Sequence, residues 1–241
     1  AGIAPEVMAM GPSIAAFLVV LIIGGRRGFV DLLRPFGCWR VGLGLWGLAI
    51  FGPAVIYLIG VGVHLLMGGD APPFIMIREE LHLIPLYLVG VVLMSWNGPV
   101  GEEFGWRAYL QPKLLPLGER KMYLLVGLIW GAWHWPVIWM GHNYPGYPIW
   151  GSLAMVWFAF VTGTFFGWAA LRAGSVWPAV IGHGALNGVA NIWLLFLAGE
   201  TNPLIGPVVV GVVGSIFFAV AAGVIFFNAR HEPAPQPAAI V

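Results

Sequence analysis

The stretch LVGVVLMSWNGPVGEEFGWR, residues 88–107, begins as a run of apolar residues and ends with two glutamates and an arginine. Its first part is typical of a membrane-spanning helix, which needs about 20 mostly apolar residues. Ionisable residues in such a helix are costly and usually face a bundle interior or a water-filled cavity. Glu102, Glu103 and Arg107 therefore mark either a working site inside a bundle or a structural polar cluster near the membrane interface.

The rest of the chain is also poor in charge. Of its 241 residues, 60% are hydrophobic and 9% are charged, and the mean hydropathy is +0.89. A soluble domain carries about 25% charged residues, so the composition predicts an integral membrane protein whose first partner is the lipid bilayer. The 13 tryptophans suit the membrane–water interfaces. A net charge of +1 gives no reason to expect a nucleic-acid partner.

Apolar runs of about 20 residues predict an all-α, polytopic transmembrane bundle of seven spans. Pro53 interrupts the second run and leaves open a division into two spans, eight in all. We expect one integral-membrane domain over 1–241, with a motif-bearing core at about 80–200 and a disordered, proline-rich tail over 229–241. The predicted spans are 6–24, 41–67, 83–107, 121–140, 150–171, 176–198 and 206–228, and the third is expected to continue as a helix toward Leu115.

The basic residues predict how the bundle is oriented. With seven spans, nine of the 11 Lys and Arg residues fall on one side of the membrane. Because Lys and Arg are enriched in cytoplasmic loops, that side is predicted to be cytoplasmic in a multi-pass protein of the cell (plasma) membrane, with the N-terminus outside and the C-terminus inside. The nine are Arg26, Arg27, Arg34 and Arg40 in the loop after the first span, and Lys113, Arg120, Lys121, Arg172 and Arg230; Arg78 lies opposite.

Helical spacing separates the two glutamates of the third span. Glu103 and Arg107 are four residues apart, so their side chains lie on one face and can pair. Glu102 is rotated by about 100° from Glu103 around the helix, so it points elsewhere and stays available for proton transfer. The alternative is a structural cluster in which Arg107 reaches toward lipid headgroups.

Two later spans also carry polar residues four positions apart. Trp130 and His134 share a face of the fourth span, shortly before Pro136, which weakens the local backbone hydrogen bonding. His183 and Asn187 share a face of the sixth span. Each pair taken alone is explained equally well by hydrogen bonding between helices.

Three spans with such groups, in a bundle otherwise almost devoid of them, predict a hydrolytic site. Glu102 would take a proton from water, an imidazole would share it, and His and Asn donors would stabilise an oxyanion. Glu102, His134 and His183 would also suit a zinc ion with one open position. No cofactor is fixed by these residues, and a divalent zinc ion stays an open alternative.

The three motifs resemble those of a known family. EEFGWR (102–107), WGAWH (130–134) and HGALN (183–187) are similar to the EExxxR, (F/W)xxxH and HxxxN patterns of the CAAX prenyl protease type II and bacteriocin-processing family, also called the CPBP or abortive-infection family. The resemblance covers about residues 80–200. It implies an intramembrane endopeptidase, of glutamate-dependent or metallo type, that cleaves a membrane-associated or lipidated peptide, with or without a prenyl group.

The resemblance also implies a role for each motif residue. Glu102 corresponds to the glutamate that activates water, and His134 to its histidine partner. His183 and Asn187 correspond to the pair that positions the water and stabilises the oxyanion. Supporting roles fall to the adjacent glutamate and the arginine, Glu103 and Arg107.

The sequence argues against several other functions and leaves others open. The spans contain no GxSG motif and no aspartate, and the chain has no HExxH, which argues against serine, aspartyl and HExxH zinc proteases. A non-proteolytic immunity or scaffold protein of the same fold stays open, as does an ion-coupled transporter that uses Glu102 as carrier. A haem protein with His134 and His183 as axial ligands would leave both glutamates unexplained.

Overall fold

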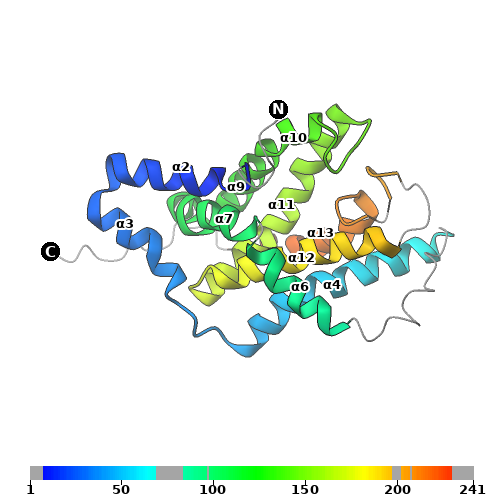
Figure 1. Ribbon diagram of the computed structural model, residues 1–241, viewed down its shortest axis with the longest axis horizontal. Helices are drawn as coiled ribbons and strands as arrows, with labels where there is room; N and C mark the ends of the chain where they lie inside the picture. The colour runs from blue at the N-terminus through cyan, green and yellow to red at the C-terminus, as the bar shows by residue number, and fades with distance from the viewer. Residues whose placement is uncertain (1–7, 69–83, 97, 197–201, 207, 230–241) are drawn as a thin grey trace.

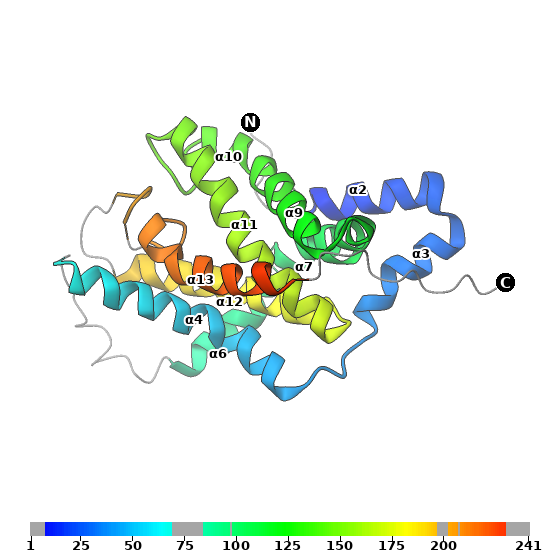
Figure 2. The ribbon, with the colours of Figure 1, turned by 180° about the vertical axis from the view of Figure 1, so that it is seen from behind.

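The computed structural model describes residues 8–68, 84–96, 98–196, 202–206 and 208–229, and over these ranges it contains helices and turns but no strand (Figures 1 and 2). The predicted all-α fold class is confirmed for this part of the chain. Arg78, Arg230 and the predicted tail beyond Ala229 lie outside the described residues, as do the outer ends of the first, third and sixth predicted spans.

The helices follow one another with short connections. The α-helices are α2 (Gly11–Val19), α3 (Gly25–Leu33), α4 (Leu43–Leu66), α6 (Ile84–Trp96), α7 (Pro99–Glu103), α8 (Gln111–Leu114), α9 (Glu119–Trp133), α10 (Trp135–Trp139), α11 (Pro148–Ala173), α12 (Trp177–Phe196) and α13 (Val212–Asn228). Two π-helices, η1 (Val20–Gly24) and η4 (Phe104–Leu110), and two 3₁₀ turns, η2 (Arg34–Phe36) and η5 (Leu115–Leu117), join some of them.

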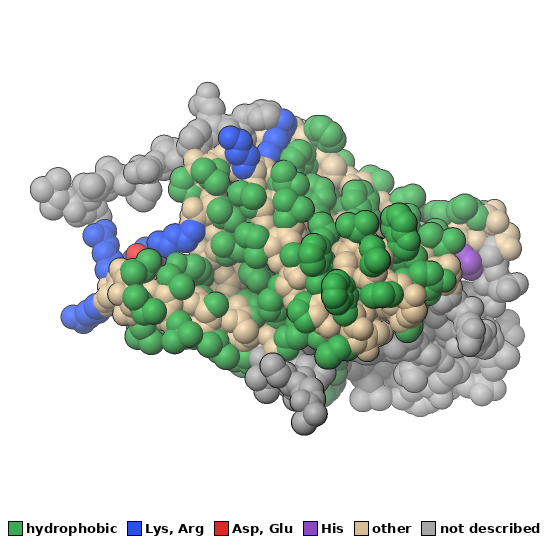
Figure 3. Space-filling view, turned by 90° about the horizontal axis from the view of Figure 1, so that it is seen from above, with side chains coloured by type: hydrophobic (Ala, Val, Ile, Leu, Met, Phe, Trp, Pro, Cys, Tyr) green, Lys and Arg blue, Asp and Glu red, His purple; other side chains and the backbone are tan. Residues whose placement is uncertain are grey.

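Four helical stretches among the described residues are long and apolar enough to cross a membrane. Large hydrophobic side chains are exposed over much of the surface, and Figure 3 shows them covering most of one face, with Lys and Arg at its edges. These features indicate a membrane protein, but the count of seven or eight spans is not confirmed. The four stretches are Gly11–Phe36, Leu43–Leu66, Glu119–Trp139 and Pro148–Ala173; Val212–Asn228 is apolar but shorter.

The second and third predicted spans have different outcomes. Pro53 lies inside the uninterrupted helix α4, so the second run is one helix and not two. The prediction of one continuous helix over 83–107 is wrong, because α6 ends at Trp96 and α7 begins at Pro99. Gly98 has a φ of 114°, a value that favours glycine, and proline suits the first turn of the new helix. As predicted, the helical path then continues through α8 to Leu114.

Two other boundaries differ from prediction. The segment that carries Arg26 and Arg27 was expected to be a loop but forms the helix α3. Its sequence GRRGFVDLL places polar and apolar side chains on opposite faces at helical spacing, which stabilises a helix at an interface. The last helix begins at Val212 and not at 206, because the preceding described residues form turns.

Helices α9 and α11 pack side by side and antiparallel (Figures 1 and 2). Gly127 lies against Phe160, and Gly131 lies against Val156, so later residues of α9 meet earlier residues of α11. At the start of α9, Arg120 donates hydrogen bonds to the carbonyls of Phe226 (2.8 Å) and Phe227 (2.6 Å) at the end of α13. The basic start of α9 and the ends of α11 and α13 therefore share one end of the bundle.

Candidate functional site

Helix α2 and the two residues before it pack against the segment that carries the two glutamates. Gly101 lies against Ala9 and Met10, and Gly105 lies so close to Pro12 that a β-carbon there would collide with the Pro12 backbone. The hydroxyl of Ser13 donates a hydrogen bond to the carbonyl of Gly101. The two glycines therefore allow α2 to contact the backbone that carries Glu102 and Glu103.

Glu103 is the centre of a buried ion cluster, which we define as Glu103, Arg107 and His183. Its Oε2 lies 3.0 Å from Nε of Arg107, and both side chains are completely buried. Its Oε1 lies 3.0 Å from Nδ1 of His183. The predicted pairing of Glu103 with Arg107 is thereby observed, and the cluster joins the α7–η4 segment to α12. The Arg107 guanidinium also lies 5.2 Å from the ring centroid of Trp130.

Glu102, the preceding residue, faces a cavity. Its Oε2 accepts a hydrogen bond of 2.7 Å from Nε1 of Trp130 on α9, and 7% of the residue is exposed. No cation pairs with it among the described residues, in contrast to Glu103. The predicted divergence of the two carboxylates is therefore present in the structure.

His134 lies where helix α9 ends and α10 begins. Its backbone N–H donates to Gly131 in a tighter turn (3.1 Å), and Pro136 lacks the N–H that would continue the α-helical pattern. Nδ1 of His134 lies 2.9 Å from the carbonyl oxygen of Trp130. Because a carbonyl only accepts, this bond requires Nδ1–H and leaves Nε2 for another partner. The bond from His183 to the Glu103 carboxylate likewise uses Nδ1.

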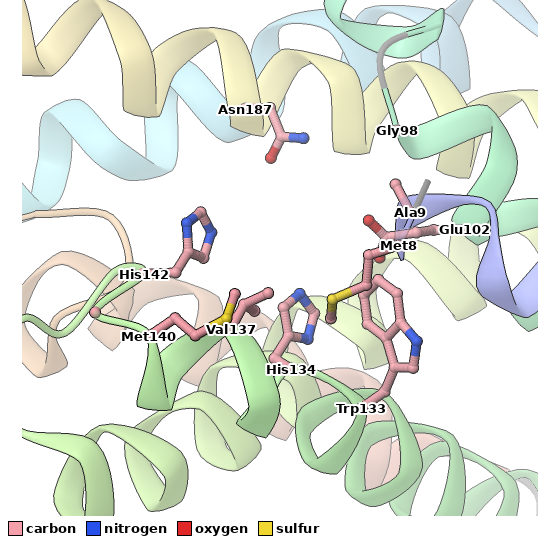
Figure 4. Close-up of a pocket in the computed structure, with 11 residues that line it drawn as sticks. Met8, Ala9, Gly98, Glu102, Trp133, His134, Val137, Met140, His142 and Asn187 are labelled. Atoms are coloured by element: carbon pink, nitrogen blue, oxygen red, sulfur yellow. The ribbon is translucent and has the colours of Figure 1, made fainter. Parts of the chain in front are cut away.

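The cavity has two adjoining chambers, of about 500 Å³ and about 270 Å³. Glu102, His134 and Asn187 line both, so the structure gathers three of the four predicted catalytic residues around shared space (Figure 4). We call these three the cavity group. The fourth, His183, lines the smaller chamber only, whereas Glu103 and Arg107 line neither chamber. The smaller chamber is otherwise mostly apolar, with Met94, Met155, Phe158, Ala159, Leu186, Ala190, Val209 and Val210 in its lining.

Two residues of the cavity were not assigned to a site from the sequence. Trp130 was predicted to share a face with His134, but its indole N–H bond to Glu102 was not foreseen. His142 was expected in or near an outer loop and was given no role, although it lines both chambers. The signal that could have found it is a histidine that follows the Pro136 break and lies between Gly141 and Asn143, two residue types that favour turns.

The predicted zinc set is not supported by the arrangement of side chains. In the ranges that the structure describes, no three His, Cys, Asp or Glu residues are grouped so that they could hold a metal ion. Glu102, His134 and His183 all border the smaller chamber, but they do not form such a group.

Comparison with protein families now gives the site a context. Residues 84–189 match the family described as "Type II CAAX prenyl endopeptidase Rce1-like". The match covers less than half of the chain, from the start of α6 into α12, and it contains all six motif residues. It supports the predicted family, which is a family of endopeptidases. A search of curated proteins finds no match.

The Rce1-like segment does not build the cavity alone. Met8 and Ala9, which precede α2, line the larger chamber (Figure 4), and Val209 and Val210, which precede α13, line the smaller one. All four residues lie outside the matched range 84–189. The polar groups thus come from the Rce1-like segment, and part of the enclosing wall comes from the residues that precede helices α2 and α13.

Proposed function

We propose that this protein is an intramembrane endopeptidase that cleaves a membrane-associated or lipidated, CAAX-type peptide with a water molecule activated by Glu102. The observation that carries this proposal is the different surroundings of two adjacent glutamates. Glu103 has its charge matched inside the buried ion cluster, whereas Glu102 faces a cavity beside His134 and Asn187. A carboxylate with a spare oxygen in such a cavity can serve as a general base.

Trp130 and His134 would prepare the water for attack. The Trp130 N–H fixes one oxygen of Glu102, which leaves Oε1 to accept a proton from the water. The His134 Nδ1–H bond to the Trp130 carbonyl directs Nε2 of the ring toward a second hydrogen bond with that water. A base held at hydrogen-bond distance contributes roughly 10²–10⁴-fold to the rate.

The reaction needs no covalent bond between the enzyme and the peptide. The water oxygen bonds to the scissile carbonyl carbon as its proton moves to Glu102, and the carbonyl oxygen becomes an oxyanion. Asn187 and His183, whose Nδ1 lies against Glu103, would stabilise that oxyanion. The C–N bond then breaks, and Glu102 returns the proton to the departing amine.

The surroundings of the site suit a substrate at the membrane. The smaller chamber is lined mostly by apolar side chains and can accept aliphatic or aromatic groups of a peptide. We place the protein in the plasma membrane, with the basic end of α9, α11 and α13 toward the cytoplasm, because basic residues favour that side. The N-terminus would then lie outside and the C-terminus inside.

The test is cleavage by the purified full chain in detergent micelles. Prenylated and unprenylated forms of one CAAX-type peptide are each incubated with the wild type and with Glu102→Gln, and the products are identified by mass spectrometry. We expect a C-terminal fragment from the wild type and none from the variant. Equal cleavage by both proteins would contradict the assignment of Glu102, and absence of cleavage by the wild type would contradict the proposed activity.

A further inference from the structure

The segment between α10 and α11 holds His142 in a fixed place at the cavity mouth. The backbone N–H of His142 donates to the carbonyl of Val137 (3.0 Å), and the carbonyl of His142 accepts from the N–H of Tyr144 (2.7 Å). Tyr144 is fully buried, and its hydroxyl donates to the carbonyl of Val210 (2.8 Å). The position of His142 is therefore anchored on both sides and not left to a loose loop.

The His142 side chain lies across the cavity from Glu102 (Figure 4). It is solvent-exposed, and it lines both chambers together with the cavity group. His134 and His183 already use Nδ1 on the Trp130 carbonyl and on Glu103. In the described part of the chain, no hydrogen bond or ion pair engages the His142 ring, and neither chamber is lined by Lys or Arg.

This placement has a use if the substrate is cleaved near its C-terminus. A peptide that is cut a few residues from its C-terminal end carries a free carboxylate on the order of 10 Å from the scissile bond when extended. That carboxylate would be repelled by Glu102 and needs a donor elsewhere in the cavity. An imidazole at the mouth, opposite Glu102, supplies a charge-assisted hydrogen bond when it is protonated.

We propose that His142 binds the C-terminal carboxylate of the substrate peptide and so restricts the enzyme to bonds near a chain end. The proposal rests on the proposed endopeptidase function and adds a specificity-determining residue to it. His142 would bind the end of the peptide and so determine which peptide bond lies beside Glu102, whereas the cavity group would act on that bond. A peptide whose C-terminus is an amide would lose this contact.

The preference should depend on pH in a defined direction. Although His142 is exposed to solvent, the protein around its ring removes part of the surrounding water, which lowers the pKa of His142 from its ordinary value, and the negative charge of Glu102 opposes that shift by raising it. The charged or titratable groups that share the cavity with it are Glu102 of α7, His134 at the α9–α10 junction and, in the smaller chamber, His183 of α12. Because the imidazole is cationic only below its pKa, the preference for a free carboxylate should be strongest in mildly acidic solution and weaken as the pH rises.

The test compares two peptides of the same sequence, one with a free C-terminal carboxylate and one with a C-terminal amide. We expect the wild type to prefer the carboxylate in kcat/KM by roughly tenfold, the effect of one hydrogen bond to a charged group. In His142→Gln and His142→Ala this ratio should fall toward one, mainly through KM. The matched control is His64→Gln on α4, away from the cavity, which should keep the ratio.

Failure of this proposal can be told apart from failure of the proposed function. A wild type without the preference, or a preference that survives both His142 substitutions, overturns the role of His142 while leaving the endopeptidase intact. If the wild type cleaves neither peptide, the proposed function fails, and the role of His142 is then judged by the binding of both peptides to the wild type and His142→Gln. Equal affinity of the wild type for the two peptides would overturn it there too.

Discussion

Glu102 and Glu103 are neighbours in the chain, yet they belong to two regions with opposite character. In the buried ion cluster, Glu103 contacts Arg107 and His183, and its side chain is closed off from solvent. In the cavity group, Glu102 is held by one neutral donor, Trp130, and faces the larger chamber. A single step along one helix thus separates a carboxylate that is paired with buried charged groups from a carboxylate that faces a cavity.

The comparison shows how a bundle with few charges can hold two adjacent carboxylates in different surroundings. A buried carboxylate needs a counter-charge or hydrogen bonds to remain ionised. Glu103 obtains both and joins helix α12 to the α7–η4 segment. That connection fixes the backbone from which Glu102 projects, so the first region serves as support for the second.

The largest effect should come from removing the base. Glu102→Gln keeps the shape of the side chain and its bond to Trp130 but cannot take a proton, so we expect kcat to fall by roughly 10⁴-fold. Peptide cleavage followed by mass spectrometry measures the loss, and thermal unfolding in detergent checks that the fold is kept. Wild-type activity in this variant would show that the two glutamates do not differ as proposed.

Breaking the buried ion cluster should instead damage the fold. Arg107→Met leaves the Glu103 carboxylate without its main counter-charge, and removing one partner of a buried pair costs about 3–5 kcal/mol. We expect a clearly lower unfolding temperature in detergent. The double variant Glu103→Gln/Arg107→Met removes both charges and should recover part of the loss. An unchanged unfolding temperature in Arg107→Met would contradict the supporting role of the cluster.

A smaller effect is expected at the other side of the cavity. Asn187→Ala removes one proposed oxyanion donor, and loss of such a donor lowers kcat by about 10²-fold or somewhat more. The decrease should appear in kcat with little change in KM, because the contact forms in the transition state. Steady-state kinetics on the same peptide separates the two constants. A change confined to KM would assign Asn187 to substrate binding.

Trp130→Phe is the mildest test of the cavity group. It removes the N–H that holds Glu102 but keeps an aromatic ring beside Arg107. Because one hydrogen bond to a charged group is lost, we expect kcat/KM to fall by about tenfold. A loss as large as that of Glu102→Gln would mean that Trp130 does more than orient the carboxylate.

Removal of metal should have no effect. No metal-holding group of side chains occurs in the described ranges, so chelator treatment and dialysis are expected to leave kcat/KM within about twofold. Metal analysis of the same preparation provides the control. Activity that disappears with the chelator and returns with zinc would replace the proposed role of Glu102 with metal-assisted hydrolysis.

The sequence predicted best those features that depend on nearby residues. Composition predicted a membrane protein, the length of the apolar runs predicted its helices, and the four-residue spacing of Glu103 and Arg107 predicted their pair. The three motifs predicted that Glu102, His134 and Asn187 would meet, because scarce polar groups in a bundle share an interior. Their catalytic roles remain predictions.

The features that the sequence did not predict depend on contacts between distant residues. His142 reaches the cavity because Tyr144 is anchored to Val210, 66 residues away. The break of the third predicted span depends on the conformation at Gly98, which hydropathy does not register. Span counting fails for a similar reason, since a run of apolar residues does not reveal where a helix bends or stops.

The close fit of Gly101 and Gly105 against Met10 and Pro12 has a practical consequence. The family match starts at residue 84, so a fragment trimmed to that match would keep every motif residue yet lose Met8 and Ala9, which line the larger chamber, and helix α2, which packs against the α7–η4 segment. Such a fragment would leave the cavity beside Glu102 open to bulk solvent or lipid. A shortened version of this protein for crystallisation or engineering should therefore retain residues 8–13, although they carry no motif.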